Sequence, residues 1–392
     1  MTKLHSFPIL FLAVALVSPS ARAEDAAATH HRGHMLLLRG QYAEAQPLLE
    51  TALGVVRANS NAPDRLLVDV LSSMAQLLRE TGELSRAEDF ARQAVAAAQT
   101  LDHAPLLAST LGVLGSIAQA QGRTTEAVQV LERALAIRER LSPPDPSAVA
   151  DSLSSLGYAY RLQNRLDESA RLLERARVSL PAGHIALPAV LNHLGNLRLA
   201  QGRAKDARKL IEEAVALWEQ RHGPDHPHIA AGLATLATIA QVQHDFGRAS
   251  RLMERARRID ERSFPADHVR VAYGLNNRAA LAAARRRFTE AESLLNQALP
   301  ILERKLPPGH PETGKIWGNL SAVYAGQNRW EAAAAACQRA LETLRAAWGP
   351  RDLRLVHLLE QSAQIERARE RYVEAARLEM QATSIRVTNT LR

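Results

Sequence analysis

A short histidine-rich stretch of the chain has residue types that suit metal binding. Residues 221–228 read RHGPDHPH, which brings His222, Asp225, His226 and His228 within eight positions. Imidazole and carboxylate groups are the ligands that zinc and non-haem iron take from proteins. A metal site is therefore the first hypothesis for this stretch, and its test is whether the stretch occurs once or recurs.

Two further groups of residues have reactive or metal-binding side chains. His30 and His34 lie four residues apart, so on a helix they share one face beside His31. Cys337 is the only cysteine of the chain and lies in the run AAAAACQRA, with no histidine or aspartate placed near it by a motif. The motifs G-x-S-x-G, H-E-x-x-H, G-x-G-x-x-G and the P-loop do not occur. We therefore expect no catalytic residue, no cofactor and no metal.

The elements that position these residues recur along the chain. The segments GQYAEAQPLLETAL from residue 40 and GRTTEAVQVLERAL from residue 122 align on a turn-forming residue that precedes an apolar helix. Nine such turns lie 38 to 42 residues apart, near 40, 82, 122, 164, 202, 244, 286, 328 and 370. An alanine stands twelve residues after each turn, and a glycine, alanine or serine seven residues before it. A bulky residue at Ala134 or Ala256 should force the helices apart, at ~1–3 kcal/mol.

The composition favours helices throughout. Aromatic residues make up only 4% of the chain, and no window alternates apolar and polar residues over the length of a strand. One helical hairpin cannot bury both of its apolar faces, so neighbouring hairpins must stack. We predict an all-α solenoid.

The repeat resembles the tetratricopeptide repeat. The motif W-x-x-L-G-x-x-Y is followed most closely by Trp317, Leu320, Ser321 and Tyr324, with Ala333 and Ala340 at the later conserved positions. The 42-residue period and joints such as GPDHP are similar to the kinesin light-chain type of this repeat. The resemblance implies a right-handed superhelical solenoid of about nine hairpins over residues 24–392.

The histidine-rich stretch recurs with this repeat. His184, His226, His268 and His310 follow one another at intervals of 42 residues, and a proline follows two of them. A polar residue before a proline is typical of a helix start, with the polar side chain as N-cap. Since neighbouring copies lie one repeat apart, roughly 10 Å, they cannot bind one ion. The pattern indicates a joint of the repeat.

The resemblance also implies a binding surface. In tetratricopeptide repeat proteins the first helix of each hairpin lines a concave groove, and a polar groove suits an extended peptide, because side-chain amides hydrogen-bond a peptide backbone. The inward positions that the resemblance implies are Arg79, Arg161, Asn192, Asn196, Tyr273, Asn276, Asn277, Lys315, Asn319, Gln364 and Arg367.

The first residues have the features of a secretory signal peptide. Lys3 precedes the apolar stretch 7–17, and the segment ends in Ala-Arg-Ala at Ala23. We predict a signal peptide at 1–23, cleaved between Ala23 and Glu24, and a periplasmic or secreted protein. The alternative is an uncleaved membrane anchor, although the apolar stretch is short for a bilayer.

The leading hypothesis for function is an exported, non-enzymatic scaffold or adaptor that binds a partner protein or an extended peptide in its groove, with no small-molecule substrate. Nine units account for residues 24–392, which leaves no segment for a catalytic domain. The net charge of +8 supports an alternative, a basic solenoid that binds nucleic acid or an anionic envelope polymer. A third hypothesis is self-association through the last helix, about 373–388, whose apolar face the repeat leaves uncovered.

Overall fold

The computed structural model describes residues 19–59, 64–143 and 145–390. The predicted signal segment thus lies mostly outside the described residues, and the first helix begins at Pro19. The described part of the chain forms helices and no strand. The hairpins are α1 (Pro19–Leu38) with α2 (Tyr42–Asn59), α3 (Arg65–Glu80) with α4 (Leu84–Thr100), α5 (Ala104–Ala120) with α6 (Thr124–Arg140), α7 (Pro146–Leu162) with α8 (Leu166–Ser179), α9 (Leu187–Ala200) with α10 (Ala204–His222), α11 (Pro227–Val242) with α12 (Phe246–Ser263), α13 (Val269–Ala284) with α14 (Phe288–Lys305), α15 (Pro311–Gly326) with α16 (Trp330–Trp348), and α17 (Leu355–Ala368) with α18 (Tyr372–Thr390).

The first helix of each hairpin, here called the A helix, ends in the same way. The second residue after it takes a positive φ, and these residues are Gly40, Gly82, Gly122, Asn164, Gly202, His244, Arg286, Asn328 and Glu370. The next amide then donates to a carbonyl five residues back, as Gln41 N does to Leu36 O at 3.0 Å. This is the Schellman motif, which stops a helix in a left-handed residue. The prediction of an all-α solenoid of helical hairpins is confirmed.

Small residues let the two helices of a hairpin approach closely. A Cβ added at Gly195 of α9 would lie 2.5 Å from the side chain of Ile211 on α10. Ala134 of α6 has no exposed surface, whereas Ala256 of α12 keeps 7% of its surface exposed. The packing role expected from the sequence therefore fits Ala134 better than Ala256.

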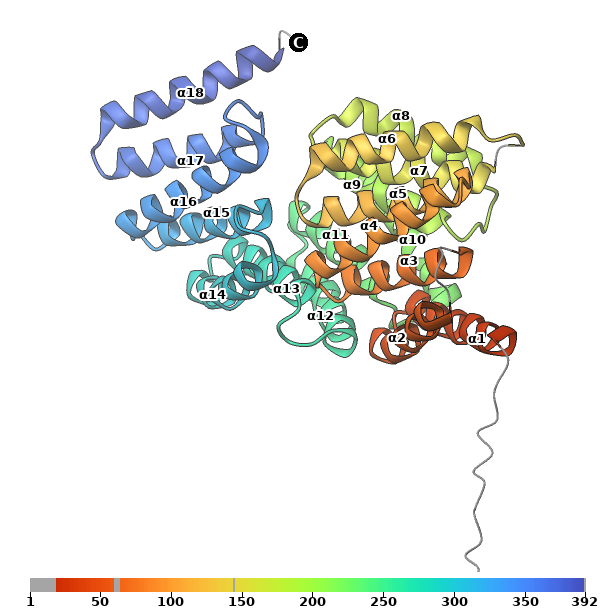
Figure 1. The fold of residues 1–392 in the computed structure, drawn as a ribbon. Helices are drawn as coiled ribbons and strands as arrows, with labels where there is room; N and C mark the ends of the chain where they lie inside the picture. Colours follow the sequence, from red (N-terminus) through yellow and green to blue (C-terminus); the bar gives the residue numbers. More distant parts are fainter. Residues whose placement is uncertain (1–18, 60–63, 144, 391–392) are drawn as a thin grey trace, which may run out of the picture.

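The solenoid turns far enough that late repeats pack on early ones (Figure 1). The His226 ring before α11 places Nε2 3.2 Å from the carbonyl oxygen of Leu38 at the end of α1, and His310 before α15 does the same to Ala120 at the end of α5. Arg354 before α17 donates to the carbonyl of Leu162, the last residue of α7. The A helices α1, α5 and α7 thus each end against the start of the A helix five repeats later.

Glycines at the turns make this contact possible. A Cβ on Gly40 would lie 2.6 Å from Cδ of Pro227, and one on Gly122 would lie 2.9 Å from Cδ of Pro311. The ring of Tyr42 also stacks on that of Phe264, with centroids 5.6 Å apart. The two superhelical turns are therefore in direct van der Waals contact.

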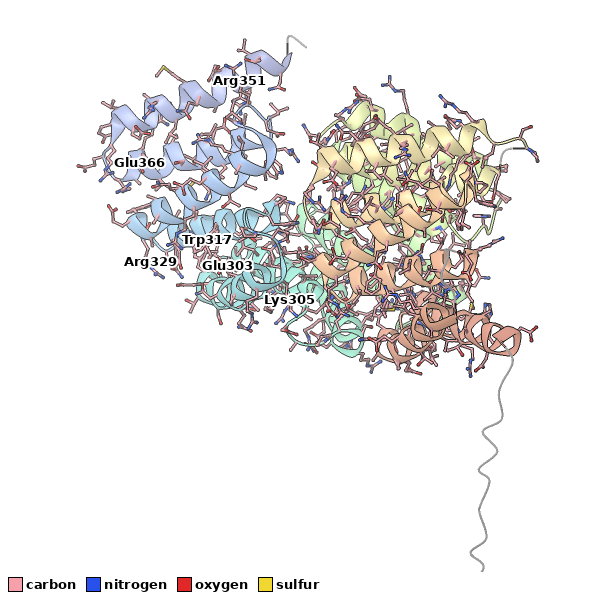
Figure 2. All side chains as sticks on the ribbon, in the orientation of Figure 1. Glu303, Lys305, Trp317, Arg329, Arg351 and Glu366 are labelled. Carbon is pink, nitrogen blue, oxygen red and sulfur yellow. The ribbon has the colours of Figure 1, made fainter. Side chains whose placement is uncertain are left out.

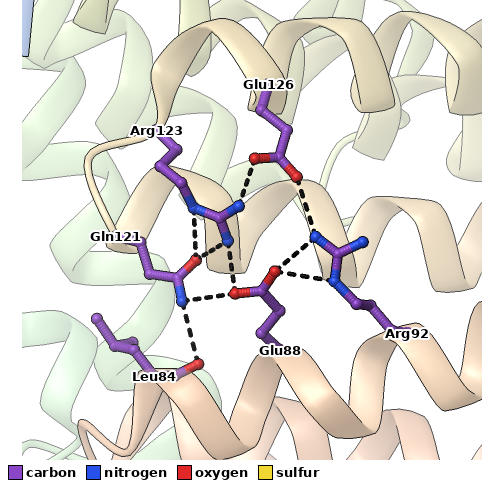
Figure 3. Close-up of polar contacts among 6 residues, drawn as sticks. All are labelled: Leu84, Glu88, Arg92, Gln121, Arg123 and Glu126. Atoms are coloured by element: carbon purple, nitrogen blue, oxygen red, sulfur yellow. Dashed lines mark hydrogen bonds and ion pairs between the residues drawn. The ribbon is translucent and has the colours of Figure 1, made fainter. Parts of the chain in front are cut away.

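Arginines tie neighbouring repeats together on the side away from the A helices. In Figure 3, Arg123 at the start of α6 bonds Glu88 of α4 at 2.6 Å and also pairs with Glu126. Burial alone would raise the pKa of Glu88, but hydrogen bonds from Gln121, Arg92 and Arg123 lower it to about 2. The carboxylate therefore stays charged and holds the joint between the second and third repeats.

The same joint recurs near the other end of the solenoid. Arg329 at the start of α16 pairs with Glu292 of α14 at 2.9 Å, and Gln327 donates to the same carboxylate. Figure 2 labels Arg329 among the many long charged side chains that cover the helices. Much of the basic charge of the chain is therefore engaged by its own carboxylates.

The last helix has an inner and an outer apolar face. Leu378 of α18 is buried, and it belongs to the same core as residues of α16 and α17. Val373, Met380 and Val387, spaced seven residues apart, are 87%, 65% and 54% exposed. Among the described helices none is both long and apolar enough to cross a membrane.

The contact between superhelical turns gives a matched test. Gly40 and Gly202 both have φ 74°, but a Cβ at Gly202 would meet nothing within 4 Å. Alanine should cost ~1–2 kcal/mol at both positions for the left-handed backbone. Gly40→Ala should cost a further ~1–3 kcal/mol because its methyl group meets Pro227. Urea unfolding midpoints measure the difference, and equal losses in the two variants would contradict the contact.

Candidate functional site

The two superhelical turns enclose a cavity of about 450 Å³ between their A helices. We call it the central cavity and define it by side chains of α3, α7, α13 and α15. Five residues expected in the groove line it, and these are Arg79, Tyr273, Asn276, Asn277 and Lys315. The cavity is also lined by Glu80, Tyr158, Arg270, Glu312 and Arg354. Most of the residues that line it are polar or charged, although their apolar parts form most of its surface.

Both carboxyl groups named in the cavity wall are paired with cations of the same wall. Lys315 Nζ lies 2.6 Å from Glu312, and Arg79 bonds its neighbour Glu80. Burial on its own would raise the pKa of both carboxyl groups, but Lys315 lowers that of Glu312, and Arg79 lowers that of Glu80. Both groups therefore stay ionised at neutral pH, which suits fixed charge and not proton transfer.

Two side chains of α13 keep unused hydrogen-bonding capacity at the cavity. Among the residues that the structure describes, neither the Asn277 amide nor the Tyr273 hydroxyl has a partner. Both side chains are half-buried. Burial raises the pKa of Tyr273, so its hydroxyl keeps its proton and can donate. These groups can bond a ligand without first breaking an internal bond.

Other asparagines expected in the groove are used to join helices. Asn319 Nδ2 of α15 donates to Asn276 Oδ1 of α13 at 2.7 Å. Thr235 of α11 donates to Asn196 Oδ1 of α9 at 3.2 Å, and Asn196 in turn donates to the carbonyl of Asn192. Their amides are therefore already partly satisfied within the solenoid.

The remaining expected residues are not among those that line the cavity, although Arg161 contacts one that does. The Arg161 guanidinium lies 5.0 Å from the ring centroid of Tyr158. Gln364 is exposed on α17. Arg367 pairs with Glu379 of α18 at 2.7 Å, inside its own hairpin. The structure thus brings five of the expected residues together at one cavity and leaves six outside its wall.

Sequence reasoning missed several cavity residues for two different reasons. Tyr158 stands six residues before its turn, the same place in the repeat as Asn196, so a wider survey of that place would have found it. Arg270 and Glu312 lie in the first turn of their A helices. They reach the cavity only because the second superhelical turn lies against the first, which no local pattern indicates.

The histidines of the opening stretch are engaged in packing. His226 Nδ1 accepts the amide hydrogen of His228 at 3.2 Å, which confirms the expected N-cap. The rings of His222 and His226 stack with centroids 4.5 Å apart, and Asp225 pairs with Arg262 at 2.8 Å. Over the part of the chain that the structure describes, no three His, Cys, Asp or Glu side chains are grouped to hold a metal ion.

The other two candidates are also occupied by internal contacts. His30 and His34 both bond the hydroxyl of Ser73, at 2.9 and 3.1 Å, and burial lowers the pKa of His30 to about 4. Cys337 is fully buried, with Sγ 3.7 Å from the carbonyl oxygen of Leu358. Burial raises the pKa of this thiol, so it is a poor nucleophile.

Comparison with known proteins decides the family. The model of the tetratricopeptide repeat matches residues 24–100, 106–177, 187–262 and 269–346, which is more than half of the chain. The chain belongs to the tetratricopeptide repeat family. The resemblance derived from Trp317, Leu320, Ser321 and Tyr324 is thereby confirmed. No curated protein matches this tetratricopeptide repeat chain in sequence.

Three solved structures illustrate what the chain is similar to. A Rap protein in complex with the Competence and Sporulation Factor is 13% identical, covers 93% of this chain and 98% of its own, and has a TM-score of 0.66. Aspartyl phosphate phosphatase F from Bacillus subtilis is 12% identical over 95% of this chain and 96% of its own, with a TM-score of 0.51. A putative kinesin light chain from Podosopora anserina with nearly identical TPR-like repeats is 25% identical over 52% of this chain and 99% of its own, with a TM-score of 0.38.

The histidine joints make stability depend on pH. Burial is the main reason that the pKa of His226 falls to about 4. Because the folded-state pKa lies below the ordinary value of ~6.5, the unfolded chain binds the proton first. This contribution to stability is complete above pH ~6.5 and is lost as the pH falls towards ~4. We expect the wild-type chain to lose about 1–3 kcal/mol at this site over that range.

His226→Asn tests this dependence, since asparagine also caps a helix but does not titrate. The free energy of unfolding, measured against pH, should vary less in this variant than in wild type. His244→Asn, at an exposed turn, is the control and should behave as wild type. A His226→Asn profile identical to that of wild type would refute the role of the joint.

Proposed function

We propose that this protein is an exported, non-enzymatic scaffold that binds an extended segment of a partner protein in its central cavity. The observation that carries the proposal is the pair of unbonded groups on α13, the Asn277 amide and the Tyr273 hydroxyl, at the wall of a cavity that both superhelical turns form. Amides and hydroxyls so placed can bond a peptide backbone of any sequence. The Rap protein of the same fold, which is complexed with the Competence and Sporulation Factor, supports a binding role.

The charges of the cavity support binding over catalysis. Glu80 and Glu312 are held ionised by neighbouring cations, so neither is poised to exchange a proton near neutral pH. The buried thiol of Cys337 lies in the core of the last repeats, apart from the cavity. The polyanion alternative is less favoured, because arginines such as Arg123 and Arg329 already pair with carboxylates of the chain.

Selection of displayed peptides tests the binding function. The mature chain from Glu24 would be used to select from a phage library of random peptides, and binders would be measured individually by fluorescence anisotropy. Asn277→Ala removes an amide from the cavity and should weaken binding about 10-fold, the loss of one or two hydrogen bonds. Asn296→Ala, the same change on an exposed position of α14, should leave it unchanged. Failure to select any binder, or equal loss in both variants, would reject this function.

The salt dependence of binding distinguishes the polyanion-binding alternative from peptide binding. A polyanion releases counterions when it binds, so its affinity falls strongly as salt rises. The polyanion-binding function would be favoured if the protein bound heparin or single-stranded DNA at low salt, lost this binding at moderate salt, and selected no peptide.

Export rests on Lys3, the apolar stretch 7–17 and the Ala-Arg-Ala ending. Protein purified from the envelope fraction of an expressing bacterium should begin at Glu24 when its amino terminus is sequenced. A chain that keeps Met1 in the soluble cytoplasmic fraction would refute export.

Self-association through α18 is a second property that a specific observation favours. Val373, Met380 and Val387 form an exposed apolar stripe. Sedimentation of the wild-type chain should show a dimer, and Met380→Glu should shift it to the monomer because it places a charge in the apolar contact. Leu378, which packs within its own core, is unsuitable for this test, since its replacement would unfold the last hairpin. A wild-type monomer would rule the property out.

A further inference from the structure

Gly274 lies in the middle of α13 without a packing reason. Glycine is less favourable than alanine inside a helix, so such a residue normally marks a close approach. That is the case at Gly115 and Gly195, where an added Cβ would lie 2.6 and 2.5 Å from a neighbouring side chain. At Gly274 an added Cβ would meet nothing within 4 Å. The space beside this glycine is open.

Four of the other eight repeats fill the corresponding space with an aliphatic side chain. Twelve residues before the turn, where Gly274 stands, four other repeats have Val70, Val190, Ile316 and Leu358. These branched aliphatic side chains are 0%, 0%, 1% and 6% exposed, so they pack into the core. The seventh repeat lacks the apolar side chain that these four repeats insert there, as do the repeats with Ala28, Thr110, Ser152 and Gly232. At Gly232 a side chain of the preceding repeat, Val215, closes the space, since an added Cβ would lie 2.6 Å from it.

A pocket of about 250 Å³ occupies the vacated space. Met253 and Ala256 of α12 line it, together with Ala231 and Ala234 of α11 and Gly274 itself. We call it the Gly274 pocket. Its position explains why Ala256, unlike Ala134, keeps some exposed surface. A larger residue at Ala256 would extend into the pocket.

The Gly274 pocket adjoins the central cavity. Arg270, Tyr273 and Asn277 line both spaces. Arg270 is already engaged, since its guanidinium bonds the carbonyl of Pro227 at 2.8 Å and lies 3.4 Å from Asp260. The unbonded Asn277 amide therefore lies where a chain in the central cavity would pass the opening of the Gly274 pocket, which has an alanine and methionine floor and Arg257, Asp260 and Arg278 elsewhere in its wall.

We propose that the Gly274 pocket binds a branched aliphatic side chain of the partner's segment. The inference rests on the proposed function and adds a sequence requirement to it. The occupant's chemistry follows from the four repeats in which valine, isoleucine or leucine fills the equivalent space. The partner's backbone then lies against Asn277 while its side chain completes the core between α11, α12 and α13. Burial of that side chain contributes to the affinity, and the hydrogen bond from the Asn277 amide fixes the position of the partner's backbone along the cavity.

A minimal probe tests the pocket without any peptide. N-acetyl-leucine methylamide would be titrated into protein labelled with ¹³C at the methionine methyl groups, with the Met253 signal assigned from Met253→Leu. We expect a saturable shift of Met253 that N-acetyl-glycine methylamide does not produce. Gly274→Leu should abolish the shift, because its own side chain fills the pocket as in other repeats. Ala234→Leu, from the opposite wall, provides a second variant should Gly274→Leu not fold.

The result that overturns the proposal is equally specific. The pocket holds no aliphatic side chain if the Met253 signal does not move or moves equally with the glycine probe. The same conclusion follows if the signal still moves in the folded Gly274→Leu or Ala234→Leu variant. Gly54→Leu is the matched control, since Gly54 is exposed on α2 and an added Cβ there also meets open space. It should retain the wild-type shift.

Selected peptides then separate this proposal from the proposed function. Peptides that bind the wild-type chain should share one Val, Ile or Leu position, and alanine at that position should weaken binding at least about 10-fold. Gly274→Leu should remove this dependence. Binders with no aliphatic requirement would leave the scaffold function standing and overturn the pocket. A Met253 shift without any selected peptide would support the pocket and reject the scaffold function.

Discussion

The contact between the two superhelical turns is the constraint on which the rest of this structure depends. The carbonyl groups at the end of an A helix have no partner within the helix, and here Leu38 and Ala120 meet the imidazoles of His226 and His310. Each imidazole also caps the helix that it begins. One neutral ring therefore satisfies the end of one helix and the start of another, five repeats apart in the chain.

Closure changes what the inner surface can do. In an open solenoid the A helices present a continuous groove, whereas here α3 and α7 face α13 and α15 across the central cavity. Fixed ion pairs such as Lys315–Glu312 line its wall and satisfy each other. Two of the groups left over for a ligand, on Tyr273 and Asn277, lie on α13, in the same repeat whose core is incomplete. Unused hydrogen-bonding capacity and unfilled volume thus coincide at one helix.

The tetratricopeptide repeat explains how such a site can arise at low cost. Each repeat packs mainly on its neighbours, so one can lose a core side chain while the hairpins on either side remain folded. The ion-paired joints, such as Arg123 with Glu88 and Arg329 with Glu292, hold repeats together on the other side of the helices. Stability and binding are therefore carried by different faces of the same helices.

The sequence by itself determined the repeat, the helical hairpins and the family, because these follow from local periodicity, turn residues and the small residues that each hairpin needs. It also identified the histidine joint as a helix start. Only the tertiary structure decided which polar residues face one another. Asn319 and Asn277 look alike in the repeat, yet one bonds Asn276 and the other has no partner among the described residues. That difference depends on contacts between helices and between superhelical turns, and no pattern within a single repeat encodes such contacts.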